Sequence, residues 1–170
     1  RIAIEHMTPV FFLSDGYIAN GSEPWKFPVS TDLVPIKVKK LSAEGDDEKY
    51  RPYVRNDKLV RDWAIPGVKG LEHRIGGLEK ENETGNVSYD PANHELMVKL
   101  RAKKVVNISD TIPDQNIEIG ENSGKVLVLG WGSTFGASKT AVTELVKDGV
   151  EVSQAHVRYL NPLPKNLRDL

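Results

Sequence analysis

A glycine-rich turn between an apolar run and an amphipathic segment is the feature that most constrains how this chain can fold. The run 125–129 has the composition of a strand buried on both faces in a parallel sheet. After glycines at 130, 132 and 136, apolar side chains recur at helical spacing until Asp148-Gly149. Residues 150–159 have the β-branched content of a second strand. The stretch 125–164 therefore predicts a βαβ unit with parallel strands and a right-handed crossover, in an α/β protein.

The turn itself allows two interpretations. Unpaired N–H groups and the helix dipole can attract an anion there, which makes Gly130, Gly132, Ser133 and Gly136 candidate ligand-binding residues, and Ser133 or Thr134 can cap the helix. The glycines follow the pattern G-x-G-x-x-x-G, which is one residue longer than the G-x-G-x-x-G motif of dinucleotide-binding proteins. No acidic residue stands about twenty residues further on, where such proteins bind the ribose hydroxyl. The nearby positions carry His156 and Arg158, and an isolated arginine is more often a surface residue. A turn that only packs helix on sheet fits equally well.

Composition limits the other functions that the chain can have. Its 170 residues are 39% apolar and 28% charged, which is typical of a soluble globular protein. A net charge of −1 does not indicate binding to nucleic acid or to anionic membranes. No apolar run is long enough to span a bilayer. Without cysteine the chain has no disulfides, thiolate zinc sites or cysteine-ligated iron–sulfur clusters. Because a lone βαβ unit buries little, we expect a fragment of a longer polypeptide.

The N-terminal residues predict a short helix and a strand. Residues 1–6 resemble the last turn of a helix, which Pro9 breaks, and 10–13 form an apolar run that predicts a buried strand. Asp15 follows it, and a carboxylate at the end of a parallel strand can belong to a site. An Asx turn or helix cap is the commoner role for such a residue.

A long stretch without periodicity follows. Residues 29–69 contain scattered prolines, a basic group at 37–40 and an acidic run at 44–48. Tyr50, Tyr53 and Trp63 favour a segment that docks on a surface.

Residues 67–94 are rich in glycine and in chemically active groups. Glu72, His73, Arg74 and Glu79 lie in one loop, where His73 with a glutamate could act as a base. His73 and His94 with a glutamate would suffice in number for a metal, but the spacing fits no zinc signature, so we predict no metal site. A hydrogen-bonded structural loop is the favoured interpretation.

A helix over about 91–106 is predicted next, capped by Asp90 and opened by Pro91. Its apolar side chains are expected to face inward and its basic ones mostly outward. The inward set is Leu96, Met97, Leu100 and Val105, and the outward set is Lys99, Arg101, Lys103 and Lys104. Residues 108–123 then form a polar linker at an expected domain boundary.

Five groups of residues, in this order, resemble the alpha subunit of 2-oxoacid:ferredoxin oxidoreductases, most closely the 2-oxoglutarate type. They span nearly the whole chain. The groups are Thr8-Pro9-Val10 through Leu13-Ser14-Asp15-Gly16, Gly70 to Lys80, Thr84-Gly85-Asn86, Asp90 to His94, and Gly130-Trp131-Gly132-Ser133 with Arg158 to Pro164.

The resemblance implies a domain assignment. Residues 1–28 would be the tail of a thiamine-pyrimidine-binding domain, 29–123 a connecting region, and 124–170 the start of a transketolase C-terminal-like domain. That domain does not usually hold thiamine, which favours packing or subunit contact for the Gly130 turn. The polar density of the loop with Glu72, His73 and Arg74, and not the resemblance, gives the hypothesis that this loop approaches the active site or a subunit interface.

It also implies the chemistry of the assembled enzyme. Such enzymes decarboxylate a 2-oxoacid on thiamine diphosphate with magnesium, pass electrons through iron–sulfur clusters to ferredoxin, and give the acyl group to coenzyme A. The diphosphate, magnesium and clusters would belong to a beta subunit, so we expect no cofactor and no catalytic residue in this chain, and a cytoplasmic location. The alternative is a free nucleotide- or coenzyme A-binding module that uses the turn Gly130–Gly136.

Overall fold

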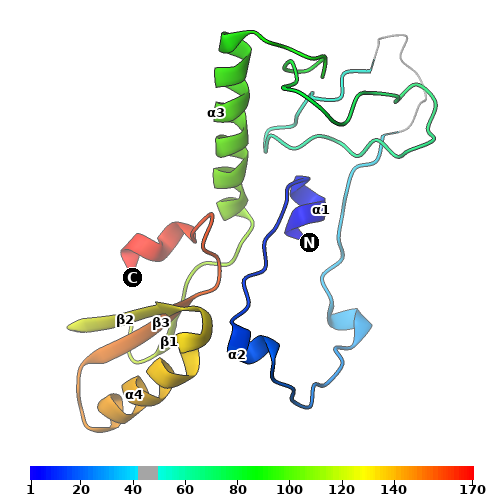
Figure 1. Ribbon diagram of the computed structural model, residues 1–170. Helices are drawn as coiled ribbons and strands as arrows, with labels where there is room; N and C mark the ends of the chain where they lie inside the picture. The colour runs from blue at the N-terminus through cyan, green and yellow to red at the C-terminus, as the bar shows by residue number, and fades with distance from the viewer. Residues whose placement is uncertain (42–49) are drawn as a thin grey trace. The chain divides into compact units, whose positions relative to one another are not determined.

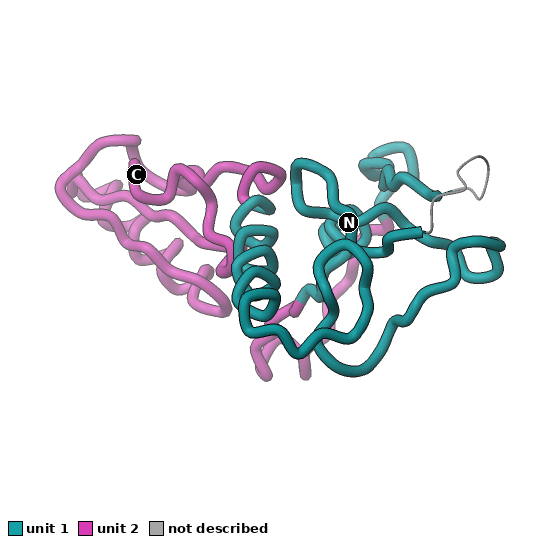
Figure 2. The backbone as a smooth tube through the Cα atoms, turned by 90° about the horizontal axis from the view of Figure 1, so that it is seen from above, with its two compact units in different colours: residues 1–10, 28–108 teal, residues 11–27, 109–170 magenta. Residues whose placement is uncertain are grey.

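The computed structural model describes residues 1–41 and 50–170. They form two compact units (Figure 2): unit 1 contains residues 1–10 and 28–108, and unit 2 contains residues 11–27 and 109–170. The acidic run 44–48 lies outside the described residues. Within the described ranges no helix has the length and apolarity needed to cross a membrane. The domain limits at residues 28 and 124 stay a prediction.

Unit 2 is built on a three-stranded sheet (Figure 1). Strands β2 (Val126–Trp131) and β3 (Val152–Val157) pair in parallel, with Val126 opposite Val152 and Trp131 opposite Val157. Helix α4 (Phe135–Lys147) connects them and lies along one face of the sheet. The predicted α/β class and the parallel βαβ unit are therefore confirmed.

The central strand β3 is the core of this unit. All six of its residues are buried, because it is hydrogen-bonded on both sides and α4 packs against it. The prediction that β2 is buried on both faces is wrong for the described chain, since Val126 and Leu129 are about half exposed on an edge strand. The apolar face of α4 is likewise only partly covered, with Val142 buried and Leu145 exposed.

Two parts of unit 2 differ from the sequence-based expectation. The predicted linker contains strand β1 (Ile117–Ile119), which pairs antiparallel with β3 on the side away from β2. The run 10–13 is extended but forms no strand, and Phe12 is 91% exposed. An extended segment becomes a strand only when a neighbour supplies hydrogen bonds, and no described segment does so here. A short helix, α2 (Gly16–Ala19), follows this run, and a 3-10 helix (Lys165–Asp169) ends the unit.

Unit 1 has two helices and a long irregular region. Helix α1 (Ile2–His6) and helix α3 (Pro91–Asn107) confirm the expected N-terminal turn and the expected long helix. Asp90 caps α3, as predicted, by accepting from the N–H groups of Ala92 and Asn93. The irregular region between them carries a 3-10 turn (Ser30–Asp32) and two isolated bridges, Lys40 with Trp63 and Lys80 with Val87.

Side chains from the irregular region and from α3 hold α1 in place. The Trp63 indole N–H donates to the Ile4 carbonyl at 3.0 Å, and the Lys104 ammonium donates to the Met7 carbonyl, just past the end of α1, at 2.7 Å. The expectation that Lys104 points outward is therefore wrong. A cation near the last carbonyls of a helix also interacts favourably with the helix dipole, which explains why Lys104 turns inward.

We expect Gly120→Ala to destabilise unit 2 strongly. Gly120 has φ +88, and a Cβ there would lie 2.6 Å from both Ser153 Oγ and the Val152 carbonyl oxygen. The left-handed backbone alone costs about 1–2 kcal/mol for alanine, and the clash with backbone atoms adds to this cost. Gly149→Ala is the matched control, since Gly149 has φ +79 and open space around it. Denaturant unfolding should show the larger loss for Gly120→Ala, and equal losses would contradict the close packing.

Candidate functional site

The Gly130 turn is closed by hydrogen bonds within unit 2. Residues Gly132–Thr134 form one 3-10 turn before α4 begins. The Ser133 hydroxyl donates to Asp15 Oδ2 at 2.9 Å, and the Thr134 hydroxyl donates to the Trp131 carbonyl at 2.9 Å. Neither hydroxyl accepts from an N–H group in the first turn of α4, so the predicted capping role is wrong. Both residues lie in the 3-10 turn that precedes α4, and their hydroxyls donate to other groups.

Asp15 has the structural role that was the commoner alternative. It caps α2 by accepting from the Tyr17 N–H at 2.8 Å. That bond, followed by the one from Ser133, lowers the pKa of the Asp15 carboxyl. A carboxylate of the chain itself therefore already accepts from the turn. Ligand binding by Gly130, Gly132, Ser133 and Gly136 stays a prediction.

Gly130 packs closely against Thr134 of the turn that follows it. Gly130 lies opposite His156 in the parallel ladder, and a Cβ at Gly130 would lie 3.0 Å from Thr134 Oγ1 and 3.8 Å from His156 Nδ1. The His156 ring is buried against Phe135, with ring centroids 4.9 Å apart. Arg158, the residue considered for a 2′-phosphate, pairs with Glu118 at 2.7 Å.

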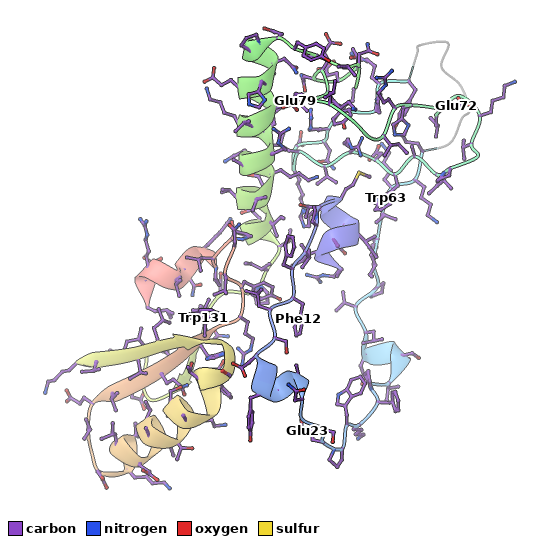
Figure 3. All side chains as sticks on the ribbon, viewed as in Figure 1. Phe12, Glu23, Trp63, Glu72, Glu79 and Trp131 are labelled. Atoms are coloured by element: carbon purple, nitrogen blue, oxygen red, sulfur yellow. The ribbon has the colours of Figure 1, made fainter. Side chains whose placement is uncertain are left out.

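The loop residues Glu72 and His73 bond to their own backbone. Glu72 accepts from the Gly70 N–H at 2.8 Å, and His73 Nδ1 lies 2.7 Å from the Leu71 carbonyl oxygen. The His73 ring contacts Tyr50 edge-on, at 5.3 Å between centroids. Figure 3 shows Glu72 and Glu79 well apart in the loop region. The structure therefore does not join Glu72, His73 and Glu79 into one acid–base group. The idea that Glu72, His73 and Arg74 face an active site or interface stays a prediction.

Glu79 instead pairs with two residues of α3. Its carboxylate lies 2.7 Å from His94 Nδ1 and 3.0 Å from Arg101 Nη1. The hydrogen bond from Arg101, and then that from His94, lower the pKa of Glu79 from 4.5 to about 2. The sequence analysis weighed His94 with His73 and a glutamate as metal ligands and predicted no metal site. Among the described residues, no group of three or more His, Cys, Asp or Glu side chains lies where a metal ion could bind.

A cavity of about 430 Å³ opens beside this ion pair, inside unit 1. Its walls come from three stretches far apart in sequence, 53–61, 75–80 and 97–104. The lining residues are Tyr53, Arg55, Leu59, Arg61, Ile75, Gly77, Leu78, Glu79, Lys80, Met97, Leu100, Arg101 and Lys104. Sequence reasoning missed this site because no single stretch carries enough of its charge to stand out.

Four cations of the cavity bond to neutral acceptors, and one of them is Lys80, which donates to the Gly76 and Leu78 carbonyls. Arg55 donates to Asn82 Oδ1 at 2.7 Å, Arg61 donates to the Pro52 carbonyl at 3.1 Å, and Lys104 donates to the Met7 carbonyl. Burial, and then the neighbouring Arg61, lower the pKa of Arg55. Burial, followed by Arg61 and Arg55, lowers the pKa of Lys104 from 10.5 to about 8. The cavity therefore concentrates positive charge in a partly desolvated place.

We expect the low pKa of Glu79 to depend on Arg101. Because the folded-state pKa lies below the unfolded value, Glu79 contributes stability above about pH 4.5, and this contribution is lost as the pH falls towards 2. In Arg101→Met the pKa of Glu79 should rise, as measured by an NMR titration of the side-chain carboxyl. Lys99→Met, on the same helix but paired with Glu95, is the control. An unchanged Glu79 titration in Arg101→Met would refute this assignment.

A second expectation concerns Lys104 in alkaline solution. Its folded-state pKa lies below its unfolded value, so the unfolded chain binds more protons between about pH 8 and 10.5. This group therefore makes stability rise with pH across that range. Lys104→Met should remove the rise, whereas Lys103→Met, at an exposed position of α3, should keep it. Unfolding midpoints measured from pH 7.5 to 10.5 decide this, and identical slopes in both variants would count against the burial of Lys104.

Known proteins that resemble this chain in sequence belong to one kind of enzyme. No family model matches the chain. It is 46% identical, over its whole length, to the 2-oxoglutarate oxidoreductase subunit KorA of Mycobacterium tuberculosis, of which it covers 25%. It is 29% identical to the alpha subunit of 2-oxoacid:ferredoxin oxidoreductase 1 of Aeropyrum pernix, over 97% of this chain and 26% of that protein.

A solved structure agrees with these relatives. The 2-oxoglutarate:ferredoxin oxidoreductase of Magnetococcus marinus, with 2-oxoglutarate, coenzyme A and succinyl-CoA bound, superimposes on 84% of this chain with a TM-score of 0.72 and 30% identity. The match covers 24% of that chain. This chain thus spans about a quarter of the length of the relatives it matches. The resemblance seen in the sequence is confirmed: the chain is homologous, over its whole length, to part of the alpha subunit of 2-oxoacid:ferredoxin oxidoreductases.

Proposed function

We propose that this chain works as part of the alpha subunit of a 2-oxoacid:ferredoxin oxidoreductase that uses thiamine diphosphate. The substrate would be 2-oxoglutarate, oxidised and decarboxylated with coenzyme A as acyl acceptor and ferredoxin as electron acceptor. The observation that carries this proposal is the 46% identity to a 2-oxoglutarate oxidoreductase subunit along the entire chain. The solved relative supports the choice of substrate and acyl acceptor, since it was obtained with 2-oxoglutarate and coenzyme A bound.

The residues of this chain do not fit the metal cofactors of that reaction. Iron–sulfur clusters are usually held by cysteine, which the chain lacks. The described residues form no group of three or more acidic or histidine side chains for magnesium. The proposal therefore assigns no chemical step to this chain and leaves magnesium and the clusters to the rest of the assembly, including a beta subunit.

Exposed apolar side chains support a role in assembly. Phe11 and Phe12 are 86% and 91% exposed in unit 2, and Tyr17 and Phe27 are nearly as open to solvent. Several large apolar side chains left open to solvent in one segment are typical of an interface. We propose that residues 11–27 pack against another part of the enzyme, as expected if residues 1–28 end a thiamine-pyrimidine-binding domain and residues 124–170 begin a transketolase C-terminal-like one.

Co-purification and an activity assay test the proposed function. The protein expressed from its own gene should co-purify with the product of a neighbouring gene. The pair, and neither part alone, should reduce a low-potential dye when given both 2-oxoglutarate and coenzyme A. Pyruvate and other 2-oxoacids test the substrate preference. Stable pairing without turnover of any 2-oxoacid would leave the homology intact and overturn the function.

A further inference from the structure

The cavity of unit 1 has an excess of positive charge. Among the described residues that line it, Glu79 is the one acid, and its carboxylate is already paired with Arg101 and His94. Arg55, Arg61, Lys80 and Lys104 form no salt bridge in the described parts of the chain, although Glu83 acts on Arg55 from a longer distance. Four cations therefore line one cavity without a described carboxylate in contact with them.

Neutral acceptors use only part of the hydrogen-bonding capacity of these groups. Arg61 donates through Nη1 to the Pro52 carbonyl and through Nη2 to Met7 Sδ, and Arg55 donates to Asn82 Oδ1 and Met97 Sδ. A guanidinium has five N–H donors, and a thioether sulfur is a weak acceptor. Each arginine is thus held in position by its neighbours and still has donors for a stronger acceptor.

Aromatic packing fixes the two guanidinium groups further. The Tyr53 ring lies beneath both, 4.6 Å from Arg61 and 5.5 Å from Arg55. Stacking of this kind restricts the planar guanidinium and lowers the entropy lost when it binds a ligand. The cationic wall is consequently preorganised before any ligand arrives.

The free-energy cost of holding several partly buried cations together points to an anionic ligand. Partly buried charges of like sign are unfavourable unless an opposite charge joins them, and the low pKa of Lys104 is one expression of this cost. A carboxylate brings one negative charge, whereas a phosphate or diphosphate brings more charge and several acceptor oxygens that match guanidinium forks. The apolar side chains of Ile75 and Leu78 at the cavity lining suit an organic portion.

We propose that this cavity is a binding site for the phosphate or diphosphate group of a small organic molecule, held by Arg55, Arg61 and Lys104. The cavity volume of about 430 Å³ lies in the usual range for small-molecule sites. The proposal is independent of the 2-oxoacid chemistry, because it concerns equilibrium binding in a single compact unit of this chain.

Calorimetric titration with inorganic pyrophosphate tests it. The protein is expressed from its own gene, with any subunit that co-purifies, and titrated at neutral pH and low salt. We expect binding that weakens about tenfold or more in Lys104→Met, a change of about 1.4 kcal/mol. Arg61→Lys should also weaken binding, because an ammonium cannot form the bidentate contact. Lys103→Met, one position earlier on the same helix and exposed, should bind as the parent does.

Several results would overturn the proposal. One is the absence of pyrophosphate binding, and another is equal binding by the parent and Lys104→Met, which would place the bound pyrophosphate elsewhere in the assembly. Succinate binding as tightly as pyrophosphate would indicate a carboxylate site instead. Circular dichroism and unfolding midpoints of each variant establish that weakened binding comes from the lost cation and not from loss of the fold.

Discussion

The parallel ladder between β2 and β3 is the constraint on which unit 2 depends. It makes β3 a central strand, with β1 on its other edge and α4 across one face. Because every residue of β3 is buried, the segments that pass close to it have little room for side chains. Gly120 must lack a side chain to pass Ser153 of β3, whereas a Cβ at Gly130 would press on Thr134 Oγ1 at 3.0 Å and make only ordinary contact with His156. Close approach of backbone to β3 thus explains Gly120.

Unit 1 is organised by hydrogen bonds and charge more than by apolar burial. Met97 of α3 is almost fully buried, but Lys80 and Asn93 beside it are buried as well. Lys80 donates to the carbonyls of Gly76 and Leu78, and Asn93 Nδ2 donates to the Lys80 carbonyl. Buried polar groups need such partners, and these bonds keep an irregular region in one conformation. The cationic cavity is a consequence of the same arrangement.

Homology and side-chain chemistry answer different questions about the chain. The relatives show that the chain is homologous to part of an oxidoreductase alpha subunit, of which it spans about a quarter. The interest of the cavity in unit 1 comes instead from Arg55, Arg61 and Lys104, which are partly buried and form no described salt bridge.

The sequence by itself determined the elements whose signals are local. Helical spacing with Asp90 and Pro91 predicted α3, and the run 125–129 with its glycine turn predicted the parallel βαβ unit, because caps, turns and periodicity act over a few residues. Only the tertiary structure decided which strands and side chains are covered. The run 10–13 has no partner strand among the described residues, Lys104 turned inward to a distant carbonyl, and Glu79 paired with His94 rather than His73. Such pairings depend on contacts between distant segments, which a local pattern does not encode.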